Sequence, residues 1–73
     1  MSPPAYVIRF DFPEGGPPFY AGMHKGAFGW APTTATALVY EDPEIAERVL
    51  CNAYLVLAEH GRVVALEDEG GRA

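Results

Sequence analysis

Residues 42 to 61 restrict the fold of this chain most, because they carry a complete set of helix signals. Asp42 can cap the start of a helix, and Pro43 suits its first position, where an amide would have no partner. Gly61 is typical of the position just after a helix. A helix over residues 43–60 would gather its apolar side chains on one arc of about 140°: Ile45, Ala46, Val49, Leu50, Ala53, Val56 and Leu57. We therefore predict one amphipathic helix with this arc against the core.

Alternating apolar residues predict strands on both sides of the helix. Residues 5–12 place Tyr6, Ile8, Phe10 and Phe12 on one face, which is typical of a half-buried strand. The Pro- and Gly-rich residues 13–18 predict a turn, and residues 19–23 predict a second strand antiparallel to the first. Three further segments follow the same reasoning. Residues 27–30 continue the second strand or form their own, residues 38–40 form a short third strand, and residues 62–67 form the last one.

The order strand, strand, strand, helix, strand predicts an α+β fold. In it, a small antiparallel sheet of three or four strands carries the amphipathic helix on one face. The last strand is expected beside the first. We predict a single domain over residues 1–73, frayed at 1–4 and 68–73. A domain of this size is marginally stable alone, so a monomer that binds a partner, or a weak homodimer, is expected.

Groups that could catalyse a reaction or bind a metal are few and poorly spaced. Cys51 is the single cysteine, so the chain has no internal disulfide, which fits a reducing cytoplasm. Cys51 and His60 would point in opposite directions from one helix, and His24 forms no zinc-type pair with either. We predict no enzymatic activity, no metal and no cofactor. The competing class, a hydrolase or metal enzyme, would need a bound metal or a closed pocket around His24 and Cys51.

The charge of the chain is strongly one-sided. Ten acidic residues against five basic ones give a net charge of -5, which disfavours direct nucleic-acid binding and favours a basic protein surface as partner. If the last strand runs antiparallel to the helix, two acidic groups share one edge and form the predicted partner-binding site: Glu41, Asp42, Glu44, Glu47, Glu67, Asp68 and Glu69. The alternative is a solvated capping cluster and a soluble tail.

A second contact surface is predicted on the outward side of the helix. Leu55 points away from the core arc there, and Cys51 and Tyr54 flank it. The alternative is one isolated exposed leucine. The aromatic residues within 19–30 are interpreted as core and rim. No apolar stretch is long enough to span a membrane and no signal peptide is visible, so a cytoplasmic location is expected.

Three local patterns occur together over most of the chain. Residues 6–9 read Tyr-Val-Ile-Arg, an aromatic hairpin ends in Gly29 and Trp30, and residues 44–50 form an acidic helix. This arrangement resembles short phage and mobile-element proteins, among which some small acidic members are anti-CRISPR inhibitors that mimic DNA. The resemblance implies a phage-derived anti-CRISPR inhibitor of a Cas effector subunit in the host cytoplasm. The alternative is an antitoxin-like or accessory module for protein interaction or oligomerisation, which uses the exposed helix face.

Overall fold

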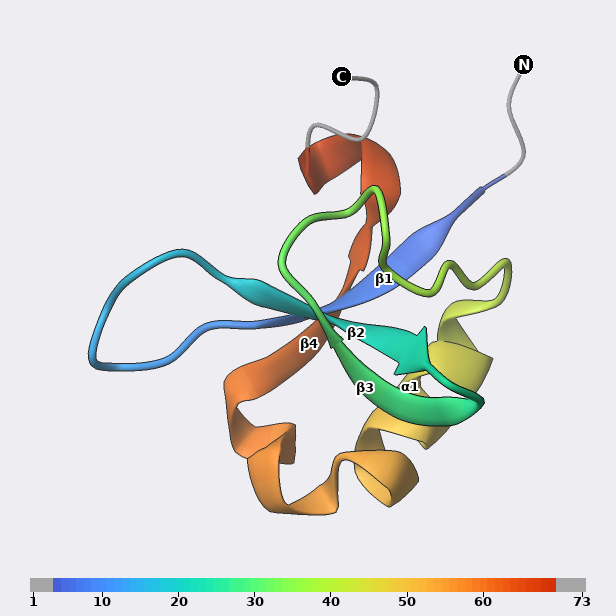
Figure 1. Cartoon of the computed structure of the whole chain (residues 1–73). Coiled ribbons are helices and arrows are strands. Elements are labelled where there is room, and N and C mark those ends of the chain that lie inside the picture. The colour runs from blue at the N-terminus through green and yellow to red at the C-terminus, as the bar shows by residue number, and fades with distance from the viewer. Residues whose placement is uncertain (1–3, 70–73) are drawn as a thin grey trace.

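The computed structural model describes residues 4–69 and has the predicted α+β class (Figure 1). Its four-stranded antiparallel sheet is ordered β3-β2-β1-β4, so the last strand lies beside the first, as predicted. The strands are β1 (Tyr6–Phe10), β2 (Phe19–His24), β3 (Ala27–Ala31) and β4 (Gly61–Ala65). The helices are α1 (Pro43–Ala53) and two 3-10 helices, η1 (Leu55–His60) and η2 (Leu66–Glu69).

A tight hairpin makes β3 a strand of its own. His24 pairs with Ala27, which leaves only Lys25 and Gly26 in the turn. Both have positive φ, 53° and 80°, and this is the signature of a type I′ turn, whose twist matches that of the flanking strands. The hairpin settles the alternative left open by the sequence, because residues 27–31 pair back along β2 instead of extending it.

The predicted strand over residues 38–40 is wrong. Residues 37–40 make only isolated bridges, at their two ends: Ala37 bridges to Gly22 of β2, and Tyr40 bridges to Tyr6 of β1. β1 and β2 pair with each other over two positions only and then diverge. The segment runs from one diverging strand to the other, and it is too short to form a ladder with either.

The predicted helix over residues 43–60 ends early, because Tyr54 leaves the helix. Tyr54 has φ -118° and separates α1 from η1. Its side chain is buried under the β2–β3 hairpin, where its hydroxyl donates to the carbonyl of Gly29 at 2.8 Å and lies 3.4 Å from that of Gly22. A buried tyrosine needs a partner for its hydroxyl, and a straight helix would carry this side chain away from those carbonyls.

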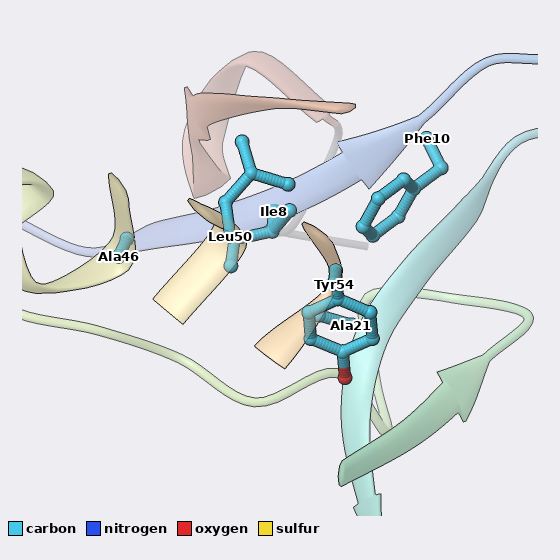
Figure 2. Packing of buried hydrophobic residues seen from close by; sticks show 6 residues of the cluster. All are labelled: Ile8, Phe10, Ala21, Ala46, Leu50 and Tyr54. Atoms are coloured by element: carbon cyan, nitrogen blue, oxygen red, sulfur yellow. The ribbon is translucent and has the colours of Figure 1, made fainter. Parts of the chain in front are cut away.

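Buried side chains lie on both faces of β1. On the α1 face, Figure 2 shows the main core, which consists of Ile8, Phe10, Ala21, Ala46, Leu50 and Tyr54. A smaller core on the opposite face consists of Val7, Tyr20 and Ala31, with Ala37, Val64 and Leu66 against it. The sheet is therefore the middle of three layers near β1, with α1 on one side and η2 on the other.

The predicted core arc of the helix is only partly right. Ala46 and Leu50 are buried, but Ile45 is 49% exposed and Val56 is 86% exposed, and Ala53 is exposed as well. The physical reason is the position of α1, which packs against β1 and β4. One flank of the predicted arc therefore lies above β3 without being covered by it.

Candidate functional site

The register of β1 brings the two acid-rich segments to the same end of the sheet. Tyr6, at the start of β1, bridges to Tyr40 and also pairs with Ala65 of β4. Glu41 follows Tyr40 directly, and Glu67 follows Ala65 by two residues. Segments 41–47 and 67–69, which are far apart in the sequence, therefore both flank the start of β1.

The two segments lie on opposite layers of the sheet. α1 rests on the face of Ile8 through Ala46 and Leu50, whereas Leu66 of η2 packs on the face of Val7. The segments that carry the predicted carboxylates thus leave the sheet near the start of β1, on opposite faces of it. They do not form one continuous face.

The Glu69 carboxylate is bound by other side chains of the protein. Its carboxylate accepts hydrogen bonds from the Arg9 guanidinium at 2.5 Å and from the Tyr20 hydroxyl at 3.0 Å, and its side chain is 8% exposed. Arg9 also pairs with Asp11, and the hydrogen bonds to Asp11 and Glu69 raise the pKa of Arg9 above its usual range. The expectation that residues 68–73 fray is corrected for 68–69, which form the end of η2; residues 1–3 and 70–73 lie outside the described part.

The other carboxylates remain on the surface. Asp42 caps α1 as predicted, since its Oδ1 accepts from the amide of Glu44 at 2.9 Å. The remaining acidic side chains of the two groups are exposed, and none forms an ion pair with another residue in the range 4–69. We call this set the acidic end: Glu41, Glu44, Glu47, Glu67 and Asp68.

The predicted surface around Leu55 needs a correction at Tyr54. Leu55 is 71% exposed and Cys51 is exposed, but Tyr54 is 7% exposed and belongs to the core. Phe28 and Trp30, which the sequence placed in core and rim, are each about half exposed, at 49% and 47%. They line a shallow apolar groove between β3 and the α1–η1 junction, together with Ala53, Leu55 and Val56.

Two further features were sought among the described residues: a cluster of metal-binding side chains and a membrane-spanning helix. Within residues 4–69, no three His, Cys, Asp or Glu side chains come together as a metal-ion site. In the same range, no helix has the length and apolar character needed to cross a membrane.

Burial raises the pKa of three tyrosines above the ordinary value. For Tyr20, burial acts first and the hydrogen bond to Glu69 adds to it. For Tyr40, burial dominates, and its hydroxyl has no hydrogen-bond partner among the described residues. For Tyr54, burial outweighs the opposing hydrogen bonds to the carbonyls of Gly22 and Gly29.

These shifts predict alkaline destabilisation. A phenol with a raised pKa in the folded state stabilises the fold fully below the unfolded pKa of about 10, and that contribution is lost as the pH rises through the folded pKa. We expect the free energy of unfolding, measured by urea titration, to fall steadily above about pH 10. Tyr20→Phe should reduce the slope. A free energy that stays level, while phenolate absorbance shows the tyrosines ionising, would contradict the burial.

The chain matches no protein-family model, no curated protein and no solved structure.

Proposed function

We propose that this chain is a non-enzymatic binding protein whose acidic end blocks a basic, nucleic-acid-binding surface of a partner protein. One observation supports the proposal: Tyr6 pairs with both Tyr40 and Ala65, and the segments that follow these two residues carry five exposed carboxylates. With a net charge of -5, the chain repels nucleic acid and attracts a positive groove.

The two-layer arrangement suits a groove better than a flat surface. Because α1 and η2 pack on opposite faces of the sheet, we propose that each acidic segment meets a different wall when this end enters a groove. Carboxylates then take the places of the phosphates that the groove would otherwise bind, and long-range attraction speeds the encounter.

The class of partner comes from the resemblance to small phage proteins, some of which inhibit Cas proteins. Under this proposal the groove belongs to a Cas effector subunit, and the chain acts as an inhibitor of anti-CRISPR type in the host cytoplasm. The carboxylate geometry supports a basic groove of any origin, so the binding mode and the partner class are separate parts of the proposal. Neither part requires a cofactor or a chemical step.

The salt dependence of binding tests the mode. Exposed charges are screened within about 10 Å at 0.1 M salt, so affinity for purified Cas effector complexes should fall at least tenfold between about 0.05 and 0.5 M salt, mainly through a slower association rate. Target nucleic acid should compete with the chain. Salt-independent affinity, or simultaneous binding of chain and nucleic acid, would refute occupation of the groove. Binding to a basic groove of another protein alone would refute only the partner class.

A further inference from the structure

The outer side of β3 is a sheet edge that no described part of the chain covers. β3 is the end strand of the sheet and pairs only with β2. Within residues 4–69, neither Phe28 nor Trp30 makes a backbone hydrogen bond to any segment outside the sheet. Natural sheets protect such edges with charged residues, prolines or bulges. The five residues of β3, Ala-Phe-Gly-Trp-Ala, include neither a charged residue nor a proline.

The hairpin register decides which backbone groups face outward. In a two-residue hairpin the flanking pair, here His24 and Ala27, exchanges hydrogen bonds, and bonded pairs then alternate along the ladder. Gly29 therefore bonds to β2. The N–H and C=O groups of Phe28 and Trp30 point away from β2 and are free to pair with another strand.

The sequence of β3 is symmetric about Gly29. Alanines lie at both ends, at 27 and 31, and aromatic residues lie at 28 and 30. A two-fold axis through Gly29 would place Phe28 of one copy opposite Trp30 of the other, as a hydrogen-bonded antiparallel pair. Both aromatic side chains lie on the α1 face, since Trp30 is 5.4 Å and Phe28 is 6.0 Å from Tyr54 between ring centroids. They would meet as cross-strand aromatic pairs, which stabilise sheets.

We propose that β3 binds the β3 strand of a second copy of this chain, which forms an isologous dimer with a continuous eight-stranded sheet. A self-complementary strand fits an isologous interface, where the same residues meet across the axis. The apolar groove lies directly beside the edge, so Leu55 and Val56, 71% and 86% exposed, are available to extend the contact.

The exposed area predicts a weak association. Half of the surface of two aromatic side chains amounts to about 200 Å² per copy, whereas a standard interface takes about 800 Å² per partner. The like net charges of the copies, -5 each, also oppose pairing. Added salt should therefore strengthen this dimer, whereas it should weaken binding through the acidic end, so the two proposals succeed or fail separately.

Sedimentation equilibrium with a matched pair of variants tests the dimer. Phe28→Lys places a charge at the free edge. Met23→Lys is the control, because Met23 pairs with Phe28 on the same face, is equally exposed at 48% and lies one strand further from the edge. The wild type should move from 7.9 kDa toward twice that mass with rising concentration. We expect Met23→Lys to follow it and Phe28→Lys to remain a monomer.

Hydrogen exchange tests the register on the wild-type chain without any substitution. The amides of Phe28 and Trp30 should become protected as concentration rises, whereas the amide of Gly29 should be protected at every concentration. A wild type that stays monomeric at its highest soluble concentration would overturn the proposal. So would a dimer that survives Phe28→Lys, a dimer that both variants abolish, or a dimer in which the amides of Phe28 and Trp30 exchange freely.

Discussion

Phe10→Ala is expected to remove most of the stability of the domain. Phe10 has no exposed surface, and its ring lies 5.0 Å from the Trp30 ring and 5.3 Å from the Tyr54 ring. It also abuts Gly61, where an added Cβ would come within 2.7 Å of the Phe10 ring. The side chain thus lies between β1, β3, β4 and the end of α1, and Figure 2 shows its ring beside Tyr54 in the core.

The size of the effect follows from the size of the chain. Truncating a buried phenylalanine to alanine costs about 3–5 kcal/mol. A domain of 73 residues has a total stability of about 4–11 kcal/mol. Phe10→Ala should therefore remove a large share of the total, and at the lower end of that range nearly all of it, so the urea midpoint should fall strongly. Urea titration followed by the fluorescence of Trp30, the single tryptophan, measures this directly.

Phe19→Ala is the matched control, because Phe19 pairs with Phe10 across the sheet but is 41% exposed. We expect it to cost clearly less than Phe10→Ala, because a large part of the Phe19 side chain is already in contact with water. Equal losses in the two variants would contradict the central position of Phe10 in the core.

The sequence predicts the elements of this fold where the signals are local. Asp42 and Pro43 mark the start of α1 at the observed residue, and alternation in residues 5–12 identifies β1. The pairing of the first and last strands also follows, because a small antiparallel sheet with one helix leaves few ways to close the core. These are the parts of the structure that depend on neighbours in the chain or on simple topology.

The errors arise where a distant residue decides the outcome. Tyr54 ends α1 because its hydroxyl reaches the carbonyl of Gly29 on another element, and the helical pattern contains no sign of that contact. Glu69 forms an ion pair with Arg9 of β1. Nothing near Glu69 in the sequence indicates this pair, so the sequence alone places Glu69 in an acidic tail. The groove beside Phe28 depends on where α1 packs over β1 and β4, and this is a property of packing between elements.

Reversing two charges on the first turns of α1 is expected to weaken inhibition strongly under the proposed binding mode. Glu44→Lys/Glu47→Lys replaces two exposed carboxylates of the acidic end with cations that a basic groove repels. Each exposed pair contributes about 0.2–1 kcal/mol, and reversal both removes the attraction and adds repulsion. Affinity for the basic partner should fall about 4- to 700-fold. The fold should persist, since the loss of favourable helix-dipole contacts costs only about 0.3–1 kcal/mol per charge.

The double variant Glu14→Lys/Glu59→Lys separates local from overall charge. This variant and Glu44→Lys/Glu47→Lys both change the net charge from -5 to -1. Glu14 and Glu59 are exposed, however, and lie near the other end of β1, where Asp11 bonds to His60 and Phe10 pairs with Gly61. If the acidic end is the binding surface, this control should keep most of the affinity and slow the association rate only modestly, because long-range attraction depends on overall charge.

Equal loss of affinity in the two double variants would mean that net charge alone drives binding. Unchanged inhibition by Glu44→Lys/Glu47→Lys would show that the carboxylates at the start of α1 do not stand in for phosphates.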